Sequence, residues 1–221
     1  MKSYSKTRQW THPEGYKYLA VWTNAILLRF LIRKFTETLS YSEHRTKTQL
    51  DDAGRSVVSN IEEGYKRPTT KEYLDFIGFS QASLEEIKGL ARQLHQDGFL
   101  KSKPGSGLAD LGIDLKEIKG LLKDSKGETP LDILYSPLKS LKASDLTFEM
   151  FMELINKTDW LFRQTVASLE KKITEEVPMS PREKWLKAQR ERQLKEDRKM
   201  DEELMKIVEE ERAKREKRGV R

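Results

Sequence analysis

Three cations stand close together in the stretch SVVSNIEEGYKRPTTKEY. Lys66 and Arg67 follow the expected end of one helix, and Lys71 lies in the first turn of the next. A helix N-terminus attracts phosphate because its amide N–H groups are unpaired and carry partial positive charge. Tyr65 and Tyr73 flank the cations, and they either stack on nucleic-acid bases or fill the end of a helical bundle. The spacing predicts a phosphate-binding turn.

Further basic side chains on the expected helices could hold phosphates by displacing their counterions. The full set of predicted nucleic-acid-binding residues is Arg29, Arg33, Lys34, Arg55, Lys66, Arg67, Lys71, Lys88 and Arg92. The alternative for each of them is a solvated helix face without a ligand. The formal net charge of +6 and the isoelectric point of about 9.2 favour a polyanionic partner, RNA or DNA, without deciding between them.

The chain has no set of residues with the spacing of a catalytic or metal site. His12, His44 and His95 are paired neither with each other nor with carboxylates at ligand spacing. The absence of cysteine excludes thiol catalysis and cysteine zinc sites, and it fits a reducing cytoplasm. The segment PGSGLADLG lacks the Gly-Lys-Ser/Thr ending of a phosphate loop. We therefore expect no enzyme activity, no cofactor and no metal, and a cytoplasmic protein without a membrane span.

Amphipathic helices must position the cations. Apolar residues recur at steps of three and four in KYLAVWTNAILLRFLIRKFTETLSY, after Thr46, after Thr69, and in LTFEMFMELINKTDWLFRQTVASLEKKI. In the last segment the predicted buried stripe is Phe148, Met152, Ile155, Phe162, Val166, Leu169 and Ile173, with Asp159 at a layer edge or in a polar contact. Four such helices predict an all-α fold, an antiparallel up-down four-helix bundle.

The second helix has predicted start, stop and register signals. Thr46 and Gln49 have the spacing of a capping box, in which two side chains satisfy unpaired amide protons. Gly64 is expected to end the helix in a left-handed conformation. Asn60 shares a row of small residues with Gly64, where another backbone can approach closely. We expect its amide to hydrogen-bond a neighbouring helix or the turn, and so to fix helix register within the bundle or between protomers.

The third helix has similar signals. Thr69 and Glu72 form a second predicted capping box, and Gly98 ends the helix. Its apolar face is broadened by Phe76 and Phe79, together with Leu90.

The predicted organisation has three parts. Residues 1–16 are a flexible leader and residues 17–177 the bundle, with an excursion over 101–145 between helices three and four. The excursion contains two short predicted helices, DLKEIKGLLKD and PLDILYSPLKSL, and packs on the bundle or on a partner. Residues 178–221 form a charged C-terminal helix whose apolar residues are too sparse for a stripe.

The stretch QLDDAGRSVVSNIEEGYKRPTTKEYLDFIGFSQASLEEIKGL resembles the signature of a family of small bacterial four-helix bundles. That family includes ribosomal RNA intervening-sequence proteins and the accessory variability determinant (Avd) proteins of diversity-generating retroelements. The matching positions are Gln49, Leu50, Ala53, Ser56, Asn60, Ile61, Glu63, Gly64, Arg67, Lys71, Glu72, Ser83, Leu84 and Glu86. Asp51 and Asp52 depart from the family's basic pair, Val58 replaces its proline, and Ala82 replaces a glycine.

The resemblance implies a homopentamer with basic surfaces. Its retroelement members bind a reverse transcriptase and its template RNA or DNA without being enzymes themselves. We therefore expect a non-catalytic nucleic-acid-binding accessory protein that oligomerises and partners a reverse transcriptase. The alternative is a structural bundle of the ribosomal RNA intervening-sequence type that binds only protein partners.

Overall fold

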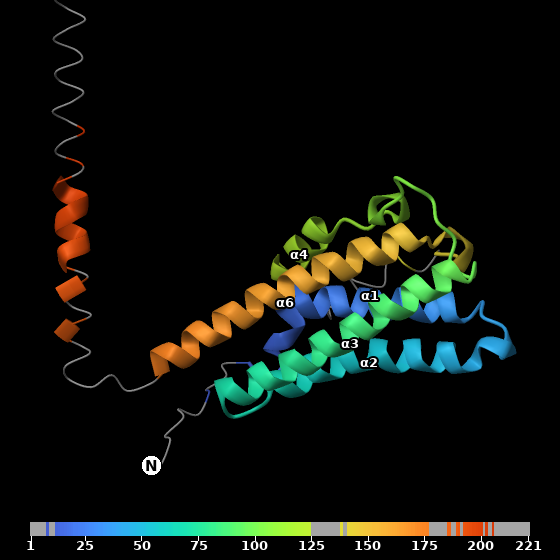
Figure 1. Cartoon of the computed structure of the whole chain (residues 1–221), viewed down its shortest axis with the longest axis horizontal. Coiled ribbons are helices and arrows are strands. Elements are labelled where there is room, and N and C mark those ends of the chain that lie inside the picture. Colours follow the sequence, from blue (N-terminus) through green and yellow to red (C-terminus); the bar gives the residue numbers. More distant parts are fainter. Residues whose placement is uncertain are drawn as a thin grey trace, which may run out of the picture. The chain divides into compact units, whose positions relative to one another are not determined.

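The protein is described by a computed structural model that covers residues 8, 12–124, 138, 141–176, 185–186, 189–190, 192–200, 202 and 205. Its long helices are α1 (Ala20–Thr36), α2 (His44–Tyr65), α3 (Thr70–Gln96) and α6 (Phe148–Glu176), with a shorter α4 (Leu115–Asp124) (Figure 1). Short 3-10 turns are η1 (Gly15–Tyr18), η2 (Tyr41–Glu43), η3 (Leu108–Leu111) and η5 (Ala143–Asp145). These residues contain no β-strand, which confirms the predicted all-α fold for the described part of the chain.

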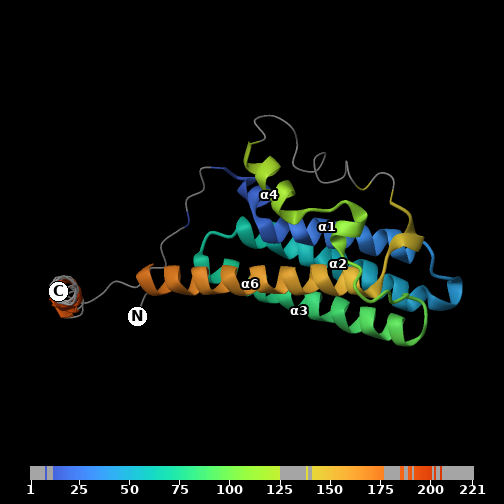
Figure 2. The same cartoon turned by 90° about the horizontal axis from the view of Figure 1, so that it is seen from above.

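The long helices contact one another in a cycle. α2 packs against α1 and α3, and α6 packs against the same two helices (Figures 1 and 2). The side chains between them are almost inaccessible to solvent, including Trp22, Ile61, Ile77, Phe151 and Phe162. Each such side chain stabilises the fold by about 1.5–3 kcal/mol relative to an exposed position. The cycle therefore encloses one apolar core.

α1 is buried around most of its circumference. Every residue from Val21 to Leu28 is buried, including the polar Thr23 and Asn24. The excursion supplies part of the cover, since α4 packs on α1 (Figure 2) and Ile118 is 5% exposed. The expectation that the excursion packs on the helices is confirmed for these residues. Its second predicted short helix lies mostly outside the described residues.

α2 begins earlier than predicted. Its first residue is His44, and the N-cap Glu43 makes no side-chain capping bond. The Thr46 hydroxyl donates to the Glu43 carboxylate at 3.4 Å. The capping box of Thr46 and Gln49 is therefore wrong, because η2 leads the chain into the helix two residues before Thr46.

The predicted boundaries of α3 are confirmed. Thr69 Oγ1 accepts from the Glu72 amide at 3.2 Å, and Glu72 Oε2 accepts from the Thr69 amide at 3.2 Å. At the other end, Gly98 has φ +80°, the Gly98 amide donates to His95 O, and the Phe99 amide donates to Leu94 O. These bonds form a Schellman motif, the expected glycine stop.

The buried face of α6 differs from the predicted stripe. Phe151 and Leu154 are buried with Ile155, Phe162 and Leu169. Four predicted members are only half-buried: Phe148, Met152, Val166 and Ile173. The face is wider because α6 packs between α1 and α3, so residues on both flanks reach the core. Asp159 is half-buried and pairs with Arg163 at 2.6 Å, which fits the predicted polar contact.

The chain divides into two compact units, residues 1–176 and residues 177–221. The described residues of the second unit are helical and exposed. Among the described helices, none is long and apolar enough to cross a membrane.

Candidate nucleic-acid interface

The connection between α2 and α3 is a tight turn. Lys66 keeps right-handed backbone angles after the last residue of α2, its amide donates to Glu63 O, and the Arg67 amide donates to Gly64 O at 3.1 Å. Pro68 and Thr69 then lead into α3. Both Lys66 and Arg67 are thereby fixed at the end of α2, and Lys71 follows them along the chain in the first turn of α3.

Gly64 does not end α2 in a left-handed conformation. It lies inside the helix, and positive φ values within the described residues occur only at Gly98, Gly105 and Gly112. A Cβ atom on Gly64 would lie 2.5 Å from Phe76 Cβ and 3.0 Å from the Tyr73 ring. Glycine is required here because α3 approaches α2 too closely for a side chain, which is the role that the row of small residues predicted.

The N-terminus of α3 is already capped by the protein. Glu72 Oε2 accepts from the Thr69 hydroxyl at 2.7 Å as well as from the Thr69 amide. This carboxylate places a negative charge at the N-cap of α3, which repels a phosphate there. The attraction for phosphate at the turn must therefore come from the cationic side chains and not from the N-terminus of α3.

The three cations of the turn form no ion pair with a carboxylate among the described residues. Lys66 is exposed, with its Nζ 5.5 Å from the centre of the Tyr16 ring. Arg67 is half-exposed, with its Cζ 4.4 Å from the centre of the Phe76 ring. Lys71 is exposed on the first turn of α3. Aromatic faces attract cations without neutralising them. The pKa of Glu14 is lowered chiefly by Lys17 and also by Lys66, so Arg67 and Lys71 are the two charges of the turn that remain most available to an anion.

Arg8 contributes a fourth cation that the sequence did not indicate. Its guanidinium donates to the carbonyl oxygens of Gly64 (3.4 Å) and Tyr65 (3.1 Å), and its amide donates to Pro68 O at 2.6 Å. Its Cζ lies 4.4 Å from the centre of the Tyr73 ring. A cation at the C-terminal carbonyls of α2 is stabilised by the helix dipole. Arg8 lies in the predicted leader, and its contacts with α2 were not indicated by the sequence.

The positions of Tyr65 and Tyr73 do not fit the prediction that their rings stack on nucleic-acid bases. Tyr73 is 4% exposed, and burial raises its pKa to about 12, against the opposing effect of Arg8. Tyr65 is half-buried between the rings of Tyr16 and Tyr73, at centroid distances of 5.8 and 6.1 Å, and Arg8 also lies over it. Both tyrosines fill the end of the helical core, which was the alternative interpretation.

Four of the other predicted cations are paired with carboxylates. The pairs are Arg33–Asp51 (3.5 Å), Lys34–Glu37 (3.9 Å), Arg55–Asp52 (3.8 Å) and Lys88–Glu85 (3.4 Å). Asp51 and Asp52, the residues that depart from the basic pair of the family signature, thus neutralise cations on α1 and α2. Surface pairs contribute only about 0–1 kcal/mol each, but they dilute the attraction for phosphate.

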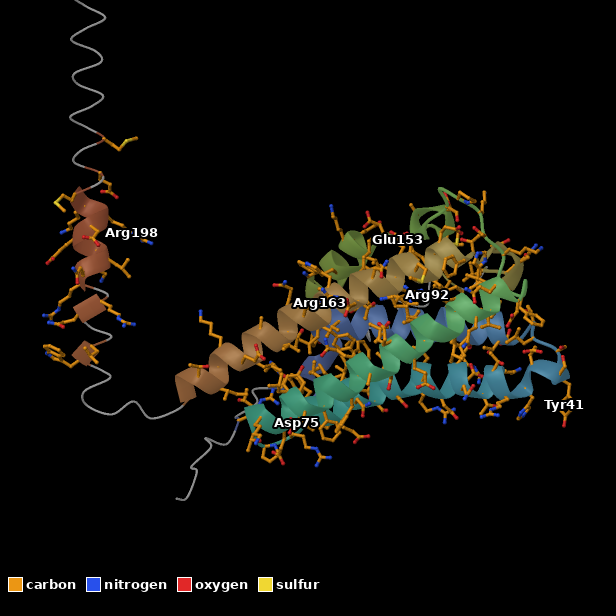
Figure 3. All side chains as sticks on the ribbon, in the orientation of Figure 1. Tyr41, Asp75, Arg92, Glu153, Arg163 and Arg198 are labelled. Atoms are coloured by element: carbon orange, nitrogen blue, oxygen red, sulfur yellow. The ribbon has the colours of Figure 1, made fainter. Side chains whose placement is uncertain are left out.

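The remaining predicted site residues lie apart from the turn. Arg29 is exposed on α1, and Arg92 is exposed toward the other end of α3, where Figure 3 labels it. Asn60 is half-buried on α2, and its side chain makes no hydrogen bond within the described ranges. The expected bond to a neighbouring helix or to the turn is therefore absent there, and a role for Asn60 between protomers stays a prediction.

The described residues contain no cluster of three or more potential metal ligands. An open pocket of about 440 Å³ lies between η3, α4 and α6, and it is lined in part by Ile113, Lys116, Glu153 and Lys157. Burial raises the pKa of Glu153, but bonds from the Lys157 ammonium and the Leu108 amide outweigh it and hold that pKa below its usual range. The Glu153 carboxylate thus already has hydrogen-bond partners within the protein, and its bond with Leu108 links η3 to α6.

Comparison with known proteins matched one family. Residues 17–123 match the model of the 23S rRNA-intervening sequence protein family. The matched segment runs from η1 into α4 and contains the whole α2–α3 turn, whereas α6 lies outside it. No relative among the curated proteins and no solved structure matched the chain. Over residues 17–123, the chain is therefore similar to the 23S rRNA-intervening sequence protein family.

Proposed function

We propose that this chain is a non-catalytic accessory protein that binds RNA or DNA phosphates through its cationic α2–α3 turn. The observation that carries the proposal is the placement of Lys66, Arg67 and Lys71. They lie at one turn without a salt bridge in the described part of the chain, whereas four other predicted cations form salt bridges. Arg8 adds a fourth positive charge to the same turn.

The mechanism is electrostatic. Each phosphate that a lysine or arginine neutralises releases condensed counterions, and this release drives binding. Because the cap of α3 uses Glu72, the binding strength depends on side-chain charges at the turn. Two further carboxylates, those of Glu63 and Asp75, are exposed near the turn and reduce its net positive charge. Affinity should therefore be moderate and should fall steeply as salt rises.

The scaffold is proposed to be an antiparallel up-down four-helix bundle. The cyclic contacts of α1, α2, α3 and α6 support this arrangement, as do the short connections from α1 to α2 and from α2 to α3. Residues 101–145 would then be a long connection across the bundle to α6.

The partners are also proposals, and they rest on the resemblance to the family signature. We propose that copies of the chain assemble into a homo-oligomer, with a pentamer favoured, and that a reverse transcriptase docks on it. Mass measurement in solution tests the first. Co-purification of a reverse transcriptase encoded in the same genome, with and without nuclease, tests the second.

The nucleic-acid proposal is tested by titrating the full chain against fluorescently labelled RNA and DNA oligonucleotides at several salt concentrations. We expect binding at low salt, with log K falling linearly as log salt rises. An affinity that barely changes with salt would exclude the electrostatic mechanism. No binding of either polymer at the lowest salt would exclude the function.

A protein-interaction bundle is the second candidate. It is favoured by the carboxylate pairs on Arg33, Lys34, Arg55 and Lys88, which make much of the helical surface neutral. Size-exclusion chromatography of fresh lysate separates the two candidates. Absorbance at 260 nm that nuclease removes supports nucleic-acid binding, and protein free of nucleic acid at every salt concentration supports the interaction bundle.

A further inference from the structure

We propose that Phe79 is a base-stacking platform, and that it makes the α2–α3 turn prefer single-stranded over double-stranded nucleic acid. The inference rests on the proposed function. It adds the class of nucleic acid and a residue that selects it.

Phe79 is exposed although the sequence placed it on the apolar face of α3. Its side chain is 56% exposed, whereas the neighbouring Phe76 is half-buried. The two rings meet edge to face, with centroids 5.7 Å apart and an interplanar angle of 76°. Phe76 is held in turn by its seat against Gly64, where no side chain intervenes. Phe79 is therefore a ring that Phe76 supports on one side and that is more than half exposed to solvent.

The ring is connected to the cationic turn. Arg67 lies over Phe76 at 4.4 Å, and Phe76 contacts Phe79, so the three side chains form a continuous file from the turn along α3. Lys71 and Phe79 are eight residues apart, which places them on one face of the helix, about 12 Å apart along its axis. A strand held by Lys71 and Arg67 at its phosphates can thus bring a base over Phe79.

Two aromatic side chains at the turn are less accessible than Phe79. Tyr73 is buried, and Tyr65 is packed between rings under Arg8. Trp160 is 60% exposed but belongs to α6, outside the file of Arg67, Phe76 and Phe79. It therefore provides a matched control: an exposed aromatic residue on the same unit without the cationic turn.

Stacking distinguishes the two forms of nucleic acid. In a duplex each base is already stacked and paired, so its face is closed to a protein side chain, whereas a single strand can turn a base onto an aromatic ring. Removing one such ring weakens single-strand binding by about 5- to 150-fold. Duplex binding, which depends on phosphates alone, should be unaffected.

Asp75 lies on α3 between Lys71 and Phe79, four residues from each. Figure 3 labels it at the end of α3 that adjoins the turn. Its exposed carboxylate repels phosphate. A base over Phe79 remains compatible with it, because a base carries no charge and its phosphate can lie on the side of Arg67.

The test compares a labelled oligouridine with a blunt-ended RNA duplex of equal length, using the full chain and the variants Phe79→Ala, Phe79→Leu and Phe79→Trp, with Trp160→Ala as control. We expect Phe79→Ala and Phe79→Leu to lose at least five-fold in oligouridine affinity at an unchanged salt slope. We expect Phe79→Trp and Trp160→Ala to stay within two-fold of the wild-type chain, and duplex affinity to change little in every variant.

The inference is overturned if the wild-type chain binds both RNAs equally, or if Phe79→Leu binds oligouridine like the wild type. It is also overturned if the Phe79 variants change the oligomeric mass and leave oligouridine affinity intact, since Phe79 would then belong to an interface between copies. The proposed function survives these results as long as salt-dependent binding persists. If the wild-type chain binds neither RNA and no DNA oligonucleotide either, both proposals fail.

Discussion

The guanidinium of Arg8 donates to the carbonyl oxygen of Tyr65 at 3.1 Å, at the C-terminus of α2. The same side chain lies over the ring of Tyr73 at 4.4 Å, so one residue of the leader contacts both helices that form the cationic turn. The contact satisfies a carbonyl group that the helix itself leaves without a partner. Arg8 therefore stabilises the turn as well as adding charge to it.

Replacing Arg8 with Ala should lower the free energy of unfolding by about 1–2 kcal/mol, because charged hydrogen bonds and a cation–π contact are lost together. Arg92→Ala is the control, since Arg92 is exposed and has no ion pair among the described residues. Urea denaturation measures both. Equal stability of the two variants would show that the Arg8 contacts contribute nothing.

Gly64→Ala and Gly78→Ala should have effects of opposite sign. A Cβ on Gly64 meets Phe76 Cβ at 2.5 Å, so the helices must shift, at a cost of about 1–3 kcal/mol. A Cβ on Gly78 meets no atom within 4 Å, and alanine there should stabilise α3 by about 0.5–1 kcal/mol. Thermal unfolding of the two variants is the measurement. A stabilising Gly64→Ala would contradict the close approach of α2 and α3.

Thr69→Ala should cost about 1 kcal/mol, the usual loss for an N-cap hydroxyl. Thr46→Ala should be nearly neutral, because Thr46 lies inside the first turn of α2 and caps nothing. Chemical denaturation of the Thr69→Ala and Thr46→Ala variants distinguishes a capping box whose hydrogen bonds are formed from a sequence that has only the spacing of one. Equal losses for the two variants would contradict the assignment of the caps.

Tyr73 should make the fold sensitive to alkaline pH. Its folded-state pKa of about 12 lies above the ordinary value of 10.0, so the native state holds the phenolic proton more tightly than the unfolded chain does. This contribution to stability is complete below pH 10 and is lost as pH rises from about 10 toward 12. In urea titrations between pH 9 and 11.5, Tyr73→Phe should lose less stability than the wild type does. Tyr41→Phe, at a residue that is 91% exposed, should behave like the wild type.

Asp75→Asn should raise the affinity for single-stranded RNA by a factor of two or more, because it removes a negative charge between Lys71 and Phe79. Asp97→Asn, at the far end of α3, serves as the control and should have no effect. Fluorescence anisotropy at low salt measures both. A weaker complex with Asp75→Asn would mean that the RNA strand does not pass along the part of α3 that carries Lys71, Asp75 and Phe79.

The sequence predicted the helices more successfully than the site. Periodicity after Thr69 identified α3 as an amphipathic helix, because a helix packed against two neighbours needs one regular apolar face, and in the structure this face is buried from Tyr73 to Leu94. The glycine stop at Gly98 followed from local backbone chemistry. The wider face of α6 did not follow, because it depends on which helices lie on either side.

At the site, the sequence showed which residues are close along the chain but not which side chains meet in the folded structure. The sequence identified Lys66, Arg67 and Lys71 at one turn, since they are close along the chain. It could not show that Arg33 and Arg55 meet carboxylates, that Tyr73 is buried, or that Phe79 is exposed. Each of these depends on which side of a helix faces solvent or a neighbour. Arg8 contacts residues more than fifty positions away, and no local pattern indicates such a contact.

The most direct test of the central claim is the salt dependence of oligouridine binding by Lys66→Ala/Arg67→Ala/Lys71→Ala, compared with Arg33→Ala/Lys34→Ala/Arg55→Ala. Each lost phosphate contact on a single strand lowers the slope of log K against log salt by about 0.7. We predict that the turn variant loses about two units of slope with most of the affinity, and that the variant of paired cations keeps a slope close to the wild type. Equal slopes for the two triple variants would contradict the assignment of the α2–α3 turn as the nucleic-acid interface.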